Sequence, residues 1–311
     1  MTAVLEFNSV NKTFRHGRKS INALRDINLS IPEGEVFGFV GPNGAGKSTT
    51  IKVMLDIIND YTGEIHIYGV PAHRAESRRG IAYLPESPAL YEQFTPREIL
   101  HMALRQYGIR RRDEKIWIGQ WLERLSLTPY ADRRIRQLSK GNVQRTAIAH
   151  ALVVQPRLLV LDEPLSGLDP VGRKEIIDLL LDYKHQGGAI FFTSHVLHDV
   201  ERIADRFGFI NQGELLTTRS PQELVSQKAG RMVVRYRCEN GEINDGTPLR
   251  EGEFEYEVAQ TDLPAWLERL NQQNGRVMEI RPSESLESVF FQILDSLQTR
   301  QVAGEGNEQN G

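Results

Sequence analysis

The sequence predicts an α/β fold with a mostly parallel sheet, an antiparallel β subdomain and a helical insertion, followed by a small C-terminal α+β domain. Three observations predict it. Short apolar strands alternate with amphipathic helices between about residues 35 and 224. The pattern becomes entirely helical between about 88 and 138. Beyond residue 225 a separate block of alternating strands and helices begins, which indicates a second domain.

Composition bounds the class of protein. Of 311 residues, 40% are hydrophobic and 25% charged, as in ordinary globular proteins. The net charge of -3 shows no basic footprint, so no nucleic-acid partner is expected. Cys238 is the single cysteine, which excludes an intrachain disulfide and favours a reducing compartment. No apolar run approaches the roughly 18 to 20 residues that span a bilayer, and the N-terminus lacks a signal-peptide pattern.

Each element follows from local pattern. The N-terminal half predicts strands at 4–10, 21–32, 35–40, 63–70 and 80–87, and a helix from 47 to 58. In the insertion, Thr95, Pro96 and Glu98 form a capping-box pattern that opens a helix ending at Gly108, and 115–127 forms a second helix. Helices are then expected at 139–154, 171–187 and 196–206, strands at 157–164 and 188–195, and a hairpin at 207–215.

The C-terminal block predicts strands at 231–238, 253–259 and 275–282 and helices at 262–273 and 284–297. The domains expected are therefore 1–225, with its helical insertion at about 88–138, and 226–298. The polar, glycine-rich stretch 299–311 is expected to be a disordered tail.

The stretch GPNGAGKST fits G-x-x-x-x-G-K-[ST] between a predicted strand and a predicted helix. Backbone N–H groups of such a loop, together with the positive end of the helix, bind polyphosphate. Lys47 is expected to reach the β and γ phosphates, and the Ser48 hydroxyl to bind Mg²⁺. A plain glycine-rich turn is the alternative, which the complete spacing and both flanks disfavour. The nucleotide-binding residues predicted here are Gly41, Pro42, Asn43, Gly44, Ala45, Gly46, Lys47, Ser48 and Thr49.

Two adjacent carboxylates follow the buried strand RLLVL. Because neighbouring strand residues point to opposite sides, Asp162 and Glu163 are expected to have different tasks. Asp162 suits Mg²⁺, directly or through water, and Glu163 suits polarising an attacking water. His195 ends the next strand at the rim where α/β sheets place functional groups. Solvated carboxylates and a surface histidine are the alternatives.

Two shorter motifs accompany them. LSKGN places Ser139 and Gly141 at a helix start, where N–H groups and the helix dipole favour an anion. Taken alone, this motif is an ordinary N-cap. SGLDP, at 166–170, is a turn closely following the carboxylates.

In this order, GPNGAGKST, LSKGN, LLVLDEP, SGLD and His195 resemble the nucleotide-binding subunit of an ABC transporter, over roughly residues 4 to 224. The resemblance implies a P-loop ATPase core that uses ATP and Mg²⁺. It also implies a head-to-tail dimer enclosing two ATP between the phosphate loop of one subunit and the signature motif of the other. Ser139 and Gly141 would then bind the γ-phosphate of the nucleotide held by the partner.

The resemblance implies further roles. Lys47, Glu163 and His195 would act in catalysis, with His195 contacting the γ-phosphate in its own subunit. Asp169 would lie at the dimer seam. Phe14 would stack on adenine, although an aromatic residue after a strand is as often a packing residue.

Two positions depart from the family pattern. The signature reads LSKGN rather than LSGGQ, so Lys140 adds a positive charge near the nucleotide. Glu86, in YLPES, stands where the family usually has the glutamine that links Mg²⁺ and the attacking water to the transmembrane partner. A carboxylate there still accepts from Mg²⁺-bound water, but the γ-phosphate repels it.

LSKG, YLPE and SLESVF (285–290) resemble the branch that pairs separate ATPase subunits with six-helix permeases, mostly exporters. The partners expected are a separately encoded permease and a second ATPase subunit, in a homodimer or heterodimer at the cytoplasmic face of the membrane. A soluble ABC ATPase of translation or DNA repair is the alternative. Such proteins usually carry two cassettes in one chain or a long coiled-coil insertion. Between residues 48 and 138 there is room only for the helical insertion. For the acidic C-terminal domain the sequence leaves open a regulatory or ligand-sensing role and a purely dimer-stabilising one.

Overall fold

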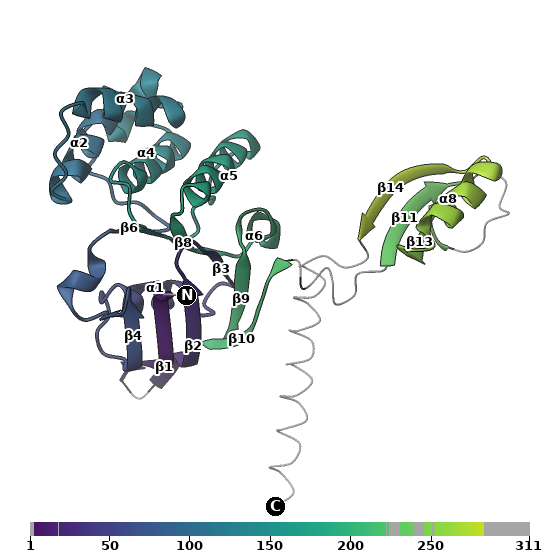
Figure 1. The fold of residues 1–311 in the computed structure, drawn as a ribbon, viewed down its shortest axis with the longest axis horizontal. Helices are drawn as coiled ribbons and strands as arrows, with labels where there is room; N and C mark the ends of the chain where they lie inside the picture. The colour runs from purple at the N-terminus through teal and green to yellow at the C-terminus, as the bar shows by residue number, and fades with distance from the viewer. Residues whose placement is uncertain are drawn as a thin grey trace, which may run out of the picture. The chain divides into compact units, whose positions relative to one another are not determined.

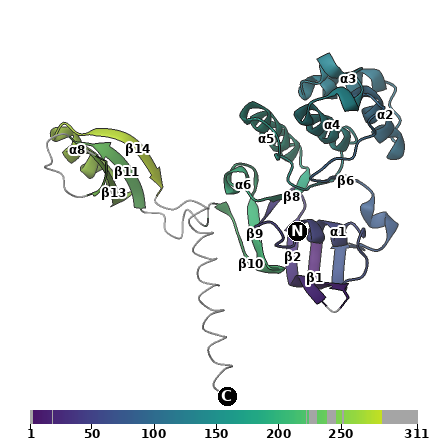
Figure 2. The same ribbon diagram turned by 180° about the vertical axis from the view of Figure 1, so that it is seen from behind.

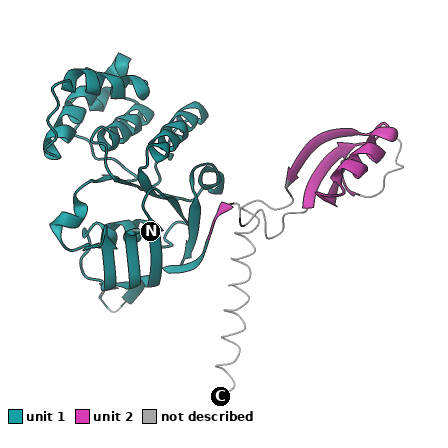
Figure 3. Ribbon diagram, in the orientation of Figure 1, with its two compact units in different colours: residues 1–218 teal, residues 219–311 magenta. Residues whose placement is uncertain are grey.

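The computed structural model describes residues 3–17, 19–221, 223, 231–238, 246–250 and 252–282. The chain divides into two compact units, Met1–Thr218 and Arg219–Gly311 (Figure 3), where composition suggested a boundary near 225. The predicted helix 284–297 and the predicted tail 299–311 lie outside the described residues.

A six-stranded sheet in the order β10-β9-β3-β8-β7-β6 forms the centre of the first unit (Figure 1). The pairs β6–β7, β7–β8, β3–β8 and β3–β9 are parallel, as the strand–helix alternation predicts. Its strands are β3 (Val36–Val40), β6 (Ile81–Leu84), β7 (Leu158–Leu161), β8 (Ala189–Ser194), β9 (Arg206–Asn211) and β10 (Glu214–Arg219). Gln212 and Gly213, both at positive φ, form the predicted hairpin turn.

An antiparallel sheet in the order β2-β1-β4-β5 packs against helix α1 (Lys47–Met54), and both share one apolar core with the central sheet. Its strands are β1 (Ala3–His16), β2 (Lys19–Pro32), β4 (Thr62–Ile67) and β5 (Val70–Pro71). The pattern at 63–70 predicts a single strand, but Tyr68 and Gly69 adopt φ values of 51° and 73° and turn the chain there. The prediction of one strand was therefore wrong.

The remaining helices of this unit are α2 (Pro96–Gln106), α3 (Glu114–Arg124), α4 (Lys140–Leu152), α5 (Pro170–His185) and α6 (Leu197–Ile203). Views from both sides place α4, α5 and α6 away from the antiparallel sheet, with α2 and α3 beyond α4 (Figure 1, Figure 2). The predicted capping box is present: Thr95 accepts from the N–H of Glu98, and the Glu98 carboxylate accepts from the N–H of Thr95 at 2.8 Å. The helix start expected at Thr95 is confirmed.

The second unit is an antiparallel sheet in the order β12-β13-β11-β14 with one described helix. Its elements are β11 (Arg231–Arg237), β12 (Thr247–Arg250), β13 (Glu253–Ala259), α8 (Leu263–Gln272) and β14 (Arg276–Pro282). Tyr236, Trp266 and the free cysteine Cys238 lie in its core. The sequence pattern missed β12, a four-residue edge strand that contains Pro248. Among the described residues no helix is long and apolar enough to cross a bilayer.

Candidate functional site

The loop between β3 and α1 requires glycine at two positions. A Cβ at Gly41 would lie 2.2 Å from the carbonyl oxygen of Ile210, at the end of β9. At Gly46, φ is 115° and a Cβ would lie 2.7 Å from the carbonyl oxygen of Ala23. The loop is therefore pressed against backbone from both sheets, which only residues without a side chain permit.

A pocket of about 690 Å³ opens over this loop. Its walls come from the phosphate loop, from β2 and from the ends of the central strands. The lining residues are Ser20, Ile21, Asn22, Ala23, Arg25, Asn43, Gly44, Gly46, Lys47, Ser48, Thr49, Glu86, Glu163, His195 and Gln212. Nine of these were singled out as site residues from the sequence, which places most of the predicted phosphate-loop residues around one cavity.

Lys47 lies in a cage of acceptors at the start of α1. Its ammonium donates to the carbonyl oxygens of Gly41 at 2.7 Å and Pro42 at 3.3 Å. It also lies 3.3 Å from Oε1 of Glu163. Lys47 is 6% exposed and Glu163 8%, so this ion pair is nearly shielded from water. The cation and the carboxylate therefore depend on each other while no phosphate is bound.

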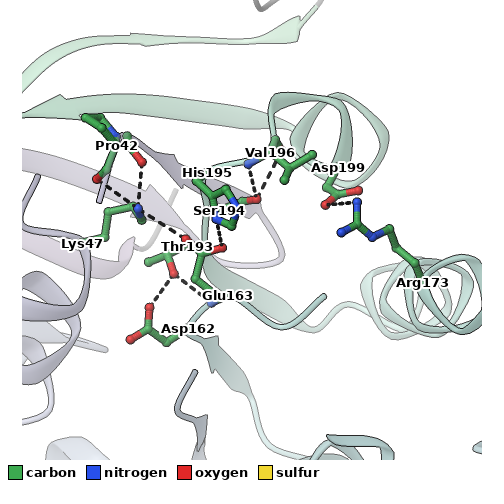
Figure 4. Close-up of polar contacts among 11 residues, drawn as sticks. Pro42, Lys47, Asp162, Glu163, Arg173, Thr193, Ser194, His195, Val196 and Asp199 are labelled. Carbon is green, nitrogen blue, oxygen red and sulfur yellow. Dashed lines mark hydrogen bonds and ion pairs between the residues drawn. The ribbon is translucent and has the colours of Figure 1, made fainter. Parts of the chain in front are cut away.

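Glu163 lies just beyond β7 with φ at 49°, a left-handed conformation that a β strand does not have. Its Oε2 lies 2.8 Å from Nδ1 of His195 (Figure 4). Its backbone N–H donates to Oγ1 of Thr193 at 3.0 Å. Lys47 and His195 thus hold its two carboxylate oxygens separately, and the group faces the pocket.

The Asp162 carboxylate has different partners from that of Glu163, as predicted. The predicted reason was wrong, because β7 ends at Leu161 and neither residue is a strand position. The Thr193 hydroxyl donates to Asp162 Oδ1 at 2.6 Å, and Asp162 is 3% exposed. Burial, with the Asp162 charge as a smaller cause, raises the pKa of Tyr83 to about 12. Thr193, on β8, therefore links the Asp162 carboxylate to the backbone N–H of Glu163. The sequence did not predict a role for Thr193, because a threonine in an apolar strand resembles any other β-branched core residue. The only feature that could have indicated this role is the Ser194-His195 pair that follows.

A second buried carboxylate lies beside this group on α6. Asp199 is 2% exposed and lies 3.5 Å from Nη1 of Arg173 on α5 (Figure 4). Burial raises the pKa of Asp199, and the charge of Arg173 partly opposes the rise. This pair does not line the 690 Å³ pocket.

The predicted signature residues lie elsewhere in the subunit. Ser139 is the N-cap of α4, and its hydroxyl accepts from the N–H of Asn142 at 3.3 Å. Gly141 is in the first turn of the same helix. Asp169 caps α5 by accepting from the N–H of Gly172 at 2.8 Å. None of the three is among the residues that line the pocket of the described subunit.

Phe14 and Glu86 are placed differently from each other. Phe14 pairs with Ile21 across the β1–β2 ladder, with the Lys12 ammonium 4.5 Å from its ring centre. Ile21 lines the described pocket and Phe14 does not. Glu86 is an exposed residue just beyond β6 and does line the pocket. Gly41, Pro42, Ala45 and Asp162 also lie outside the pocket lining.

Comparison with known proteins agrees with this geometry. Residues 24–166 match the family model described as ABC transporter. An uncharacterized ABC transporter ATP-binding protein of Synechocystis sp. is 34% identical over 94% of this chain and 84% of its own length. The Nod factor export ATP-binding protein I of Mesorhizobium japonicum is 34% identical over 79% of this chain and 70% of its own length.

Among solved structures, one described as the ATP binding subunit of an ABC transporter superposes with a TM-score of 0.65. It is 29% identical, and the match covers 73% of this chain and 93% of that one. The relatives are subunits of transporters, which removes the alternative of a non-transport ATPase. The chain belongs to the ABC transporter family, as an ATP-binding and ATP-hydrolysing subunit that drives a membrane transporter.

Proposed function

We propose that this subunit drives an exporter, by closing as a dimer around ATP at the cytoplasmic face of the membrane and reopening after hydrolysis. The observation that carries the proposal is the buried Lys47–Glu163 ion pair together with the exposed His195, all of which line the pocket. It combines a phosphate-binding cation with a carboxylate held to face the nucleotide. The export direction rests on the likeness to the Nod factor export protein, whose name states that activity.

In the proposed reaction, ATP phosphates bind the loop N–H groups and draw the Lys47 ammonium away from Glu163. Released on that side, the Glu163 carboxylate accepts a hydrogen bond from the attacking water and polarises it. The contact of His195 with the other oxygen keeps the carboxylate oriented, and His195 reaches the γ-phosphate. The water oxygen then bonds to the γ-phosphorus and its proton passes to the Glu163 carboxylate. The bond between the γ-phosphorus and the bridging oxygen breaks, and its electrons leave with ADP.

Mg²⁺ fits the residues present. Ser48 offers a hydroxyl at the pocket, and the hydrogen bond from Thr193 occupies only one oxygen of Asp162. No group of three His, Cys, Asp or Glu in the described ranges could hold a metal alone. Such a sparse donor set suits Mg²⁺, which usually binds through one or two carboxylates, water and substrate phosphates. When bound, it would neutralise phosphate charge, with Ser48 and Asp162 holding it.

The pocket of one subunit lacks Ser139 and Gly141, which supports a composite site completed by a second subunit. A mixing experiment tests this. Lys47→Met removes the cation, and Ser139→Phe blocks the exposed start of α4. Each variant alone is expected to lose ATPase activity. In the mixed dimer both defects fall in one site, and the other site is intact. Mixing should therefore restore turnover, up to about one quarter of wild type if subunits pair at random.

The control for mixing is each variant combined with wild-type protein in the same ratio, which separates complementation from dilution. Two inactive variants that stay inactive together, although each is folded and the mixture dimerises, would contradict a composite site. Restored turnover in a mixture of Lys47→Met and Glu163→Gln would also contradict it, because both residues belong to the same subunit's half.

The permease is expected to dock on the helical insertion, where α2 and α3 flank a groove of about 860 Å³. Phe94, Met102 and Ile118 are the apolar residues of its lining. Its charged lining residues are of both signs: Arg97, Arg105, Lys115, Glu98 and Glu114. This chemistry fits an amphipathic permease helix whose polar side carries charges of both signs. Motion of the insertion would then pass directly to the membrane subunit.

Glu86 lies between the pocket and this insertion, directly after β6. Glu86→Gln removes a carboxylate that the γ-phosphate repels, so ATP affinity without Mg²⁺ should rise. The ratio of ATP affinities with and without Mg²⁺ should therefore become smaller, and permease-stimulated turnover should change. Titration calorimetry at both conditions measures the first effect. Glu92→Gln, an exposed change outside the pocket, is the control. Unchanged Mg²⁺ dependence together with unchanged stimulation would refute this role.

A further inference from the structure

Charge is divided unevenly between the helical insertion and the rest of the chain. Residues 95–137 contain ten Lys or Arg and five Asp or Glu, a net charge of +5. The whole chain carries -3, so the remainder is strongly negative. The insertion is a positively charged module on an acidic protein, which gives the molecule a preferred orientation toward any negative surface.

Part of this positive charge is neutralised within the insertion. Arg97 pairs with Asp132 at 2.8 Å, and Arg111 pairs with Asp113 at 3.1 Å. Six other arginines are exposed and take part in none of the ion pairs found among the described residues, and one of them, Arg105, lines the α2–α3 groove. The other five residues, termed the arginine surface, are Arg110, Arg112, Arg133, Arg134 and Arg136. Their charge is available to an external partner.

The arginine surface has two parts, at the two ends of α2. Residues 133–136 lie beside the start of the helix, because the N–H of Ile135 donates to the carbonyl oxygen of Phe94 at 2.8 Å. The N–H of Arg136 likewise donates to the carbonyl oxygen of Glu92 at 3.2 Å. Arg110 and Arg112 follow the end of the helix. An eleven-residue helix separates the two parts by about 16 Å.

This spacing argues for an extended anionic partner. None of the five arginines lines the nucleotide pocket or the α2–α3 groove, and the length of α2 separates the two parts, so they do not converge on one small anion. A small phosphate ligand needs converging donors, whereas a charged surface needs only exposed cations within a Debye length of it. Separate arginine groups at the two ends of α2 satisfy the second requirement.

We propose that the arginine surface binds the anionic headgroups of the lipid bilayer. The proposal rests on the proposed function, which brings the insertion to the membrane. It adds a lipid contact that flanks the permease contact and fixes the insertion against the headgroup layer. Each basic residue near an anionic bilayer strengthens association about five-fold, so five of them can hold a subunit there without any inserted segment.

Nucleic acid is the less favoured partner. Its backbone would also attract the arginines, but the acidic remainder of the chain would repel a long polyanion. An acidic permease segment is a third source of negative charge. It would need to reach both ends of α2 while the groove between them is occupied.

Vesicle sedimentation with the purified full-length subunit tests the proposal without ATP or permease. Binding is expected to phosphatidylcholine vesicles containing phosphatidylglycerol, to weaken with added salt, and to be absent for phosphatidylcholine alone. The triple variant R133Q/R134Q/R136Q should bind about 100-fold more weakly, and R110Q/R112Q about 25-fold more weakly. ATP affinity of these variants should match wild type, since they are outside the nucleotide pocket.

Two control variants test whether binding depends on positive charge and on its position in the arginine surface. R133K/R134K/R136K keeps the charge and should retain binding. K19Q/K52Q/K174Q removes three exposed cations elsewhere and should also retain it. The proposal is overturned if the two triple Gln variants lose binding equally, or if phosphatidylglycerol has no effect. Duplex DNA that competes at equal phosphate concentration would assign the surface to nucleic acid, and binding only to vesicles containing the permease would assign it to that protein. Each of these failures would leave the ATP site proposal standing, because ATP affinity is measured separately.

Discussion

Replacing Glu163 with glutamine is expected to lower steady-state ATP hydrolysis at least about 100-fold while ATP still binds. Glutamine has nearly the same shape as glutamate but cannot accept a proton from the attacking water. The closed, ATP-bound dimer should therefore accumulate. Phosphate release measures the rate, and light scattering with and without ATP measures the dimer.

The geometry gives this experiment a matched control. Asp199 is another carboxylate in the same region, 2% exposed and 3.5 Å from Arg173, but it does not line the nucleotide pocket. Asp199→Asn should change stability and keep turnover near wild type. Normal turnover in Glu163→Gln, or an equal loss in both variants, would remove the catalytic role assigned to Glu163.

Replacing Lys47 with methionine should have two effects of different origin. ATP affinity should fall about 10- to 100-fold, because hydrogen bonds to charged groups are worth about 1.5 to 3 kcal/mol. The free energy of unfolding should also fall, by about 3 kcal/mol, because Glu163 stays buried without its cation. Calorimetry with ATP measures the first effect and urea denaturation the second.

The double variant Lys47→Met/Glu163→Gln separates these effects. Removing the unpaired charge should restore most of the stability, whereas ATP affinity should stay low. If the double variant is as unstable as Lys47→Met, the ion pair at 3.3 Å is not the cause of the instability. If Lys47→Met binds ATP normally, ATP binding by the phosphate loop does not depend on this cation.

The sequence predicts the central sheet well for a physical reason. Strands such as β7 and β8 are buried on both faces, so each is a continuous apolar run with few other interpretations. The same holds for the phosphate loop, whose glycines are required by backbone contacts at Gly41 and Gly46. Patterns fail where a single residue changes the backbone direction. Tyr68 interrupts an apparent strand by adopting a positive φ, which a tyrosine in the sequence does not predict.

The site was only partly predictable. The carboxylates and His195 could be found because their positions at strand ends are readable from apolar runs. The link through Thr193 could not be found, because it depends on how β8 pairs with β7. Phe14 and Ile21 are direct cross-strand partners and lie on one face of the β1–β2 ladder. Which of them lines the pocket depends on which strand lies next to the phosphate loop, and the sequence does not show this because both positions are apolar.

The buried contact between Lys47 and Glu163 bears on how the subunit distinguishes ATP from ADP. Any nucleotide that uses the Lys47 ammonium must first compete with the carboxylate for it. ATP competes with the charge of its γ-phosphate, which ADP lacks. In the proposed mechanism, the empty subunit therefore disfavours ADP more than ATP, and the carboxylate proposed to polarise the attacking water also promotes the release of ADP. On this proposal, one ion pair bears on both nucleotide selection and product release.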